Sequence, residues 1–315
     1  MFYINPFFSK VKGTNCTDFT MQHRHALATL QLVAVRKRIC LATMRAKYRR
    51  LQSACLCIGK AVQFCNWSNY INRLESGKGK QGVMYTTVLW DIDMTLLDFL
   101  AAEKYAIGEC FRIFGLGVCS DEMLERYSAI NRKYWERLER GEITKQETLE
   151  GRFREFFASE GLPVEKAEAF NAEYQERLGD VAIYCPHGRE VIDYLQQQGI
   201  RQYAVTNGTQ TAQRRKLANS GLDQIFVRAF ISDEIGYEKP DVRFFEPVLQ
   251  ELKDCRKEEI LLIGDSLTSD IKGANNAGLA CCWYNPKKTI NDKGVRIDYE
   301  IQDLLEIEQI VGKRV

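Results

Sequence analysis

Short apolar runs alternate with amphipathic stretches throughout the part of the chain that follows Tyr85. The runs are rich in Val, Ile and Leu, which is typical of strands buried on both faces of a parallel sheet. We predict five strands, at Thr86–Ile92, Gln202–Thr206, Val227–Ser232, Ile260–Gly264 and Leu279–Tyr284. Helical apolar spacing between them predicts helices at Gly188–Gln198, Thr211–Ser220, Val242–Leu252 and Thr268–Ala277. This alternation favours an α/β fold in which helices cover both faces of a parallel sheet.

A long block between the first and second predicted strands reads as helices only. We predict helices at Ala101–Phe114, Asp121–Arg140, Lys145–Glu160 and Glu165–Leu178. About eighty residues are too many for a simple connection between a strand and a helix. We therefore predict a separate helical cap at residues 99–180, over an α/β core made of residues 84–98 and 181–315. A binding domain for another protein is the alternative interpretation of this block.

Residues 1–83 differ from the rest of the chain in charge and show no clear period. They hold fourteen Lys or Arg and two acidic residues, a net charge of +12, whereas the remaining 232 residues carry −10. Three interpretations compete: an organellar transit peptide, a basic arm that binds nucleic acid, and an upstream extension that is not translated in the native host. We favour the extension, because Glu75–Gly82 can be written in purine-rich codons and directly precedes Met84 and a predicted strand. Met84 would then be the native start, and residues 1–83 would be no part of the α/β protein.

Overall composition excludes some classes of protein. Apolar residues make up 45% of the chain and charged residues 27%, which is typical of globular proteins. No run approaches the roughly 18 apolar residues that a membrane-spanning helix needs. The whole chain has a net charge of +2, which points to no particular partner, and we expect neither nucleic acid nor a membrane. The eleven cysteines lack a Cys-x-x-Cys pair, so we expect free thiols and a cytoplasmic location.

Two acidic residues lie at the predicted carboxyl end of the first strand. Asp91 and Asp93 are alternate residues, so their side chains project to the same side. Carboxylates this close repel each other unless a cation lies between them or one carries a proton. Both arrangements suit phosphoryl transfer, in which one carboxylate attacks phosphorus and the other gives a proton to the leaving oxygen. Solvated acids that cap the next turn are the alternative.

Polar residues also follow the second and third predicted strands. Thr206, Asn207 and a glycine end the second strand, and a hydroxyl with successive backbone N–H groups there can hold phosphate oxygens. The same three residues are also ordinary turn residues. Lys239, which precedes a proline after the third strand, would neutralise phosphate charge if it faces the sheet, or would be a solvated loop lysine if it does not.

Acidic residues follow the fourth predicted strand as well. Asp265 lies at the strand end, and Asp270 lies in the first turn of the next helix. An aspartate at a helix start is often only a cap. Combined with Asp91, however, Asp265 would form a site of hard oxygen ligands that suits Mg²⁺.

The four motifs in this order resemble those of the haloacid dehalogenase-like hydrolase superfamily: Asp-x-Asp-x-Thr from Asp91, Thr-Asn-Gly from Thr206, Lys-Pro from Lys239 and Gly-Asp-Ser-x-x-x-Asp from Gly264. The resemblance covers residues 84–315 and implies a Rossmann-like core with an inserted type-one cap; nothing in residues 1–83 matches. Further segments resemble the pyrimidine 5′-nucleotidase branch, whose members dephosphorylate nucleoside monophosphates: Leu96–Phe99, Ala102–Lys104, Arg140–Thr144, Ser232–Gly236, Gly264–Gly273 and Cys282–Pro286. Met94 departs from the pattern, since many relatives carry Gly or a polar residue there, and we expect altered loop packing.

The resemblance implies a role for each motif residue. Asp91 would be the nucleophile that forms an aspartyl-phosphate. Asp93 would be the general acid that protonates the nucleoside O5′ and then the base that activates water. Thr206 and the Asn207 amide would hold the phosphoryl oxygens, while Lys239 would neutralise charge.

The same resemblance implies Mg²⁺ as the cofactor. Its ligands would be the Asp91 carboxylate, the Asp93 backbone carbonyl and Asp265, with Asp270 in support. The expected substrate is a nucleoside 5′-monophosphate, preferably a pyrimidine nucleotide. A phosphatase for phosphoglycolate or a sugar phosphate, a phosphomutase and a 2-haloacid dehalogenase are alternatives within the enzyme class, and a catalytically silent binding protein is the alternative outside it. A dehalogenase would need neither the metal nor a second acid.

Overall fold

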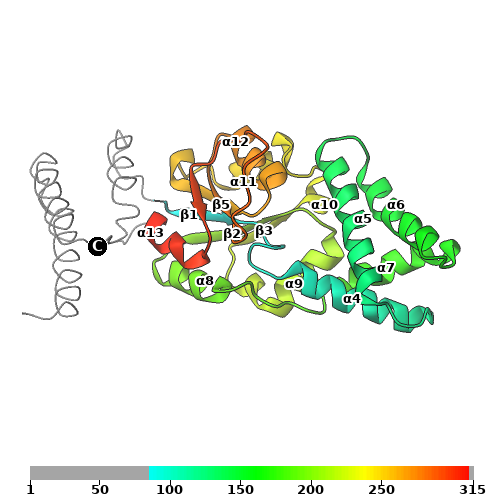
Figure 1. The fold of residues 1–315 in the computed structure, drawn as a ribbon. Helices are drawn as coiled ribbons and strands as arrows, with labels where there is room; N and C mark the ends of the chain where they lie inside the picture. The colour runs from blue at the N-terminus through cyan, green and yellow to red at the C-terminus, as the bar shows by residue number, and fades with distance from the viewer. Residues whose placement is uncertain (1–84, 312–315) are drawn as a thin grey trace, which may run out of the picture. The chain divides into compact units, whose positions relative to one another are not determined.

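The computed structural model describes residues 85–311, so the interpretations of residues 1–83 and of Met84 as a start lie outside the described residues. Six parallel strands form one sheet in the described chain, in the order β3-β2-β1-β4-β5-β6 (Figure 1). The strands are β1 (Thr87–Trp90), β2 (Arg201–Thr206), β3 (Arg228–Ile231), β4 (Ile260–Gly264), β5 (Ala280–Tyr284) and β6 (Tyr299–Ile301). The predicted α/β class with a parallel sheet is confirmed.

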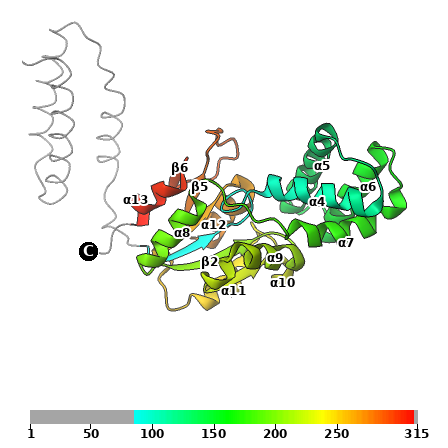
Figure 2. The same cartoon turned by 90° about the horizontal axis from the view of Figure 1, so that it is seen from below.

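Helices cover both faces of this sheet because its strands are apolar on both sides. Trp90 of β1 faces one apolar cluster and Leu89 faces another. The first cluster includes side chains of α8 (Gly188–Gln197), α9 (Gln210–Ser220) and α13 (Ile307–Val311). The second includes side chains of α11 (Val242–Glu251) and α12 (Lys272–Ala277), on the opposite face (Figures 1 and 2). A short helix, α10 (Ser232–Ile235), follows β3.

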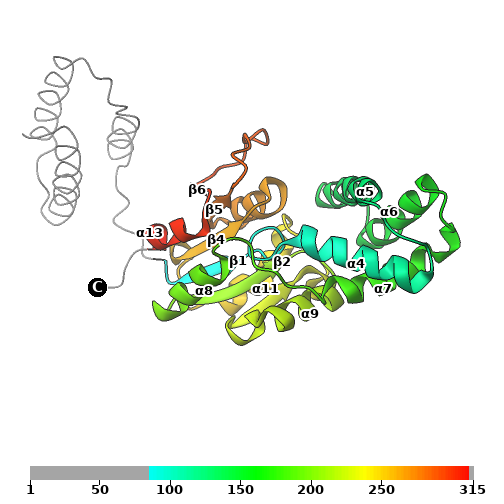
Figure 3. The ribbon, with the colours of Figure 1, turned by 60° about the horizontal axis from the view of Figure 1, so that its bottom comes forward.

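Four helices inserted after β1 form the cap, at the end of the sheet away from α13 (Figures 1 and 3). They are α4 (Phe99–Phe114), α5 (Asp121–Glu139), α6 (Lys145–Ser159) and α7 (Ala167–Leu178). Polar N-caps fix where three of them begin: the side chains of Asp98, Ser120 and Thr144 each accept a bond from a backbone N–H of the first turn. The helices pack around an aromatic cluster that is fully buried. Its rings are those of Phe111, Tyr127, Phe153, Phe156, Phe157, Phe170 and Tyr174.

The remaining differences from the predicted elements are local. The helix predicted at Thr268–Ala277 begins with a π-helical turn, η4 (Leu267–Ile271), before α12 continues it. Short 3₁₀ turns occur at η1 (Val164–Lys166), η2 (Leu222–Gln224), η3 (Lys257–Glu259) and η5 (Leu304–Glu306). The elements α10, β6 and α13 were not predicted. Within residues 85–311, no helix is both long enough and apolar enough to cross a membrane.

Candidate active site

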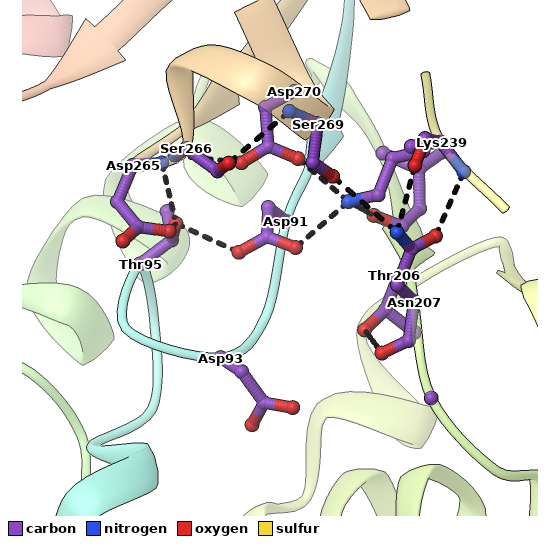
Figure 4. Close-up of polar contacts among 12 residues, drawn as sticks. Asp91, Asp93, Thr95, Thr206, Asn207, Lys239, Asp265, Ser266, Ser269 and Asp270 are labelled. Atoms are coloured by element: carbon purple, nitrogen blue, oxygen red, sulfur yellow. Dashed lines mark hydrogen bonds and ion pairs between the residues drawn. The ribbon is translucent and has the colours of Figure 1, made fainter. Parts of the chain in front are cut away.

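The carboxyl ends of β1, β2 and β4 meet because β1 pairs with β2 on one side and with β4 on the other. Asp91 follows β1, Thr206 is the last residue of β2, and Asp265 follows β4. Lys239 comes from the loop after α10 and Asp270 from η4. Figure 4 shows these side chains gathered around Asp91.

Lys239 links the carboxylates of this group. Its side chain is 1% exposed, and Nζ donates to Asp91 Oδ1 at 2.8 Å, to Asp270 Oδ1 at 2.6 Å and to the Val205 carbonyl at 2.7 Å (Figure 4). An ammonium group has three donors, and all three are used here. Burial lowers the pKa of Lys239, but the charges of Asp270 and Asp91 outweigh burial and raise it above its ordinary value. Lys239 therefore remains a cation that orients both carboxylates.

Thr95 fixes the other oxygen of Asp91, a role that the sequence analysis did not assign although Thr95 belongs to the Asp-x-Asp-x-Thr motif. Its hydroxyl donates to Asp91 Oδ2 at 2.9 Å and accepts from the Asp265 backbone N–H at 3.1 Å. Trp283 Nε1 donates to the Asp265 carbonyl at 2.8 Å. With one oxygen on Lys239 and the other on Thr95, the Asp91 carboxylate is held in one orientation.

Three carboxylates lie close enough together to bind one cation. Each of Asp91, Asp265 and Asp270 contributes one carboxylate oxygen, and these three oxygens lie within 4.8 Å of one another. Burial and the charge of Asp270 raise the pKa of Asp91 to about 7, against the opposing effect of Lys239. Burial and the charge of Asp91 raise the pKa of Asp265 well above its ordinary value. Such mutual repulsion is what a divalent cation relieves, and an all-oxygen donor set fits Mg²⁺.

The Asp93 side chain turns away from Asp91 (Figure 4). Two side chains of helix α9 hold it instead. Lys216 Nζ donates to Asp93 Oδ1 at 2.5 Å, and Gln213 Nε2 donates to Oδ2 at 2.7 Å. Sequence reasoning missed both partners, although they lie three residues apart and therefore share a face of the helix that follows the Thr-Asn-Gly turn. Lys216 is 1% exposed, so its charge is compensated inside the protein. The adjacent Met94 has φ 66°, a left-handed conformation that favours glycine.

The side-chain amide of Asn207 is engaged with the Lys239 backbone. Its Oδ1 accepts from the Lys239 N–H at 2.9 Å, and its Nδ2 donates to the Lys239 carbonyl at 3.0 Å. This pair of bonds ties the loop after β2 to the loop that carries Lys239. Thr206 is fully buried, and its hydroxyl donates to the Asn207 carbonyl at 3.3 Å. A phosphate contact by the Asn207 amide, as the sequence analysis expects, would therefore have to use its backbone N–H.

The cap contacts the strand-end loops on two sides of this group. Glu139 at the end of α5 accepts from Thr268 Oγ1 at 2.6 Å, and burial raises the pKa of Glu139 to about 7. Lys145 at the start of α6 donates to the Gly208 carbonyl at 2.7 Å and to Ser232 Oγ at 3.1 Å. The hairpin between α5 and α6 thus lies against the loops that follow β2, β3 and β4.

Comparisons with known proteins agree with this geometry. A family model described as haloacid dehalogenase-like hydrolase matches residues 88–284. The chain is 37% identical over 228 residues to the pyrimidine 5′-nucleotidase PynA of Streptococcus pneumoniae, covering 71% of this chain and 95% of PynA. It is 28% identical over 192 residues to the pyrimidine 5′-nucleotidase YjjG of Escherichia coli, covering 61% of this chain and 84% of YjjG. The crystal structure of the HAD-hydrolase YfnB from Bacillus subtilis bound to magnesium has a TM-score of 0.68 and 33% identity, covering 72% of this chain and 99% of YfnB.

Proposed function

This chain belongs to the haloacid dehalogenase-like hydrolases, and we propose that it is a Mg²⁺-dependent phosphatase that hydrolyses nucleoside 5′-monophosphates, preferring pyrimidine nucleotides. The observation that carries the proposal is the Asp91 carboxylate, held by Lys239 and Thr95 beside two further carboxylates at the strand ends. The choice of substrate is supported by the similarity to PynA and YjjG, which are named pyrimidine 5′-nucleotidases.

In the first step, an oxygen of Asp91 attacks phosphorus and the bond from phosphorus to O5′ breaks. The electron pair leaves on O5′, which takes a proton from the carboxylic acid form of Asp93. Lys239 compensates the negative charge of the phosphoryl group and of Asp91, and Thr206 and the Asn207 backbone N–H bind phosphoryl oxygens. Since the charge of the transferring group is spread over its oxygens, orientation and charge compensation supply most of the rate.

In the second step, Asp93 is a carboxylate and accepts a proton from water. The water oxygen attacks phosphorus, the bond from phosphorus to Asp91 breaks, and inorganic phosphate is released. Gln213 and Lys216 donate to both oxygens of the Asp93 carboxylate, so they hold it beside α9.

The donor set of the site supports Mg²⁺ as the cofactor. Asp91, Asp265 and Asp270 would hold it, together with the backbone carbonyl of Asp93, and YfnB was crystallised bound to magnesium. When bound, the cation compensates the charge of the carboxylates and of the phosphoryl oxygens. A metal-free dehalogenase would not require the acidic side chains of Asp93, Asp265 and Asp270. Their presence therefore favours a phosphatase over a dehalogenase.

A phosphate-release assay across substrates tests the proposal. With Mg²⁺ present, we expect kcat/KM to be higher for UMP, dUMP and dTMP than for AMP, ribose 5-phosphate and phosphoglycolate. EDTA should abolish release from every substrate. A highest kcat/KM for phosphoglycolate or a sugar phosphate would replace the nucleotidase assignment with one of the alternatives, and no release at all would favour a binding protein.

A further inference from the structure

One face of α5 carries a row of three side chains that reach from the cap interior to the strand-end loops. Asn131, Trp135 and Glu139 are spaced four residues apart, so they lie along the same side of the helix. Contacts fix both ends of the row. Glu139 Oε2 bonds to Thr268, two residues before Asp270, and Asn131 Nδ2 donates to Glu103 Oε1 of α4 at 3.0 Å. Trp135 therefore lies between these contacts, on the side of α5 that faces α4 and the core.

Trp135 differs from the other large aromatic residues of the cap. Most of those rings belong to the buried aromatic cluster, whereas Trp135 is half-buried and belongs to none of the three apolar clusters among residues 85–311. The neighbouring Tyr134 packs toward α6 instead, where its ring fills the space beside Gly151. An indole that is partly exposed and packs into no apolar cluster is able to stack against a flat ligand.

Buried polar groups gather around Asn131, one helical turn from Trp135. Glu103 is 1% exposed and Arg152 is 2% exposed. Arg152 donates through Nη1 to Asn131 Oδ1 at 2.7 Å, while its Nε is buried without a partner in the described chain. Buried polar groups are normally all hydrogen-bonded, so an unpartnered guanidinium nitrogen next to the row is unusual. A flat aromatic surface beside buried hydrogen-bonding groups suits a planar heterocycle that carries carbonyl and N–H groups.

We propose that Trp135 is the surface on which the base of the nucleotide stacks, and that it is the residue that makes the enzyme prefer nucleotides to phosphate esters without a base. This proposal rests on the proposed function, in which the phosphoryl group of the nucleotide lies at Asp91. The sugar then passes Asp93, and the base enters the space between the core and the cap. Trp135 is one helical turn from Glu139, which contacts the loop that carries Asp270.

Paired substrates test the stacking role. We expect Trp135→Ala and Trp135→Leu to lower kcat/KM for UMP by about 5- to 150-fold, the range that loss of one base–aromatic stack produces. Both variants should change kcat/KM for ribose 5-phosphate, which lacks a base, by less than about two-fold, since stacking cannot contribute there. Trp135→Phe should restore most of the activity on UMP. Tyr134→Ala, the matched control on the same helix, should leave the ratio of the two kcat/KM values unchanged.

The outcomes separate this proposal from the proposed function. If wild-type protein prefers UMP to ribose 5-phosphate but Trp135→Ala and Trp135→Leu keep that preference, stacking on Trp135 is wrong while the nucleotidase assignment stands. If wild-type protein shows no preference for UMP, both are wrong. Equal losses on both substrates would mean that Trp135 only maintains the cap. Melting temperatures show whether each variant folds. If Trp135→Ala fails to fold, the result for Trp135→Leu decides the test, because leucine keeps an apolar side chain at this position.

Discussion

Gly264 at the end of β4 allows Asp270 to lie directly against the strand. A Cβ atom at this position would lie 2.3 Å from Asp270 Cγ and 2.5 Å from Asp270 Cβ, distances that real Cβ atoms do not reach. Asp270 cannot swing aside cheaply, because it is buried with one oxygen on Lys239 Nζ and the other on the Ser266 backbone N–H at 3.0 Å. Gly264→Ala must therefore displace Asp270, and with it the carboxylate that orients Lys239.

The expected cost follows from these contacts. Overpacking of a tight interior costs about 1–3 kcal/mol, and weakening a hydrogen bond between charged groups adds about 1.5–3 kcal/mol. We therefore expect Gly264→Ala to lower the free energy of unfolding by about 2.5–6 kcal/mol. Since a misplacement of about 1 Å can reduce turnover by about 100-fold, kcat should fall by at least that factor.

Urea unfolding and Mg²⁺-dependent hydrolysis of p-nitrophenyl phosphate measure the two effects. Gly108→Ala in α4 is the matched control, because an added Cβ there meets no atom within 4 Å. The control should keep wild-type kcat and gain up to about 1 kcal/mol from the higher helix propensity of alanine. If Gly264→Ala keeps wild-type stability and a kcat within about three-fold of wild type, the contact between Gly264 and Asp270 does not support the site.

Other changes test separate groups of the site. Asp93→Asn should lower kcat for UMP more than kcat for p-nitrophenyl phosphate, because nitrophenolate leaves without a proton; equal losses would argue against acid catalysis by Asp93. Asp265→Asn should raise the Mg²⁺ concentration needed for half-maximal activity, and an unchanged Mg²⁺ titration would remove Asp265 from the ligands. Glu139 has a pKa of about 7 in the folded chain against an ordinary 4.5, so the wild type loses stability as pH rises through that window. The free energy of unfolding of Glu139→Gln should therefore equal that of wild type at pH 4 and exceed it by at most about 3 kcal/mol at pH 8. Equal stability of the two proteins at both pH values would contradict the raised pKa of Glu139.

The fold followed from the sequence wherever apolar runs are long and buried on both faces. The strand predicted at Ile260–Gly264 matches β4 at both ends, and the other predicted strands deviate by one or two residues. The edge strand β6 was missed because its three residues, Tyr299–Ile301, are too short to show a period. The π-helical turn η4 was missed because apolar spacing over five residues does not distinguish it from the first turn of an α-helix.

The placement of the site followed from topology, because the ends of neighbouring parallel strands must meet. That argument brings Asp91, Asp265 and Lys239 to one place, as the structure has them. The topology of the sheet does not predict which side chains of the surrounding helices contact the site. Lys216 has the pattern of a solvated helix lysine, and only tertiary packing buries it against Asp93. The indole of Trp135 is likewise indistinguishable in sequence from an aromatic residue of the cap core.

The nucleophilic role of Asp91 is the central claim, and turnover of UMP by Asp91→Asn tests it most directly. The amide has nearly the shape of the carboxylate, and burial already disfavours the charge of Asp91, so the variant should fold as wild type does. An amide cannot attack phosphorus, however, and with saturating Mg²⁺ we predict that kcat for UMP falls by at least about a thousand-fold while the melting temperature is maintained. A folded Asp91→Asn variant that keeps more than about a tenth of wild-type kcat, a loss below about 1.4 kcal/mol in the barrier, would contradict the account.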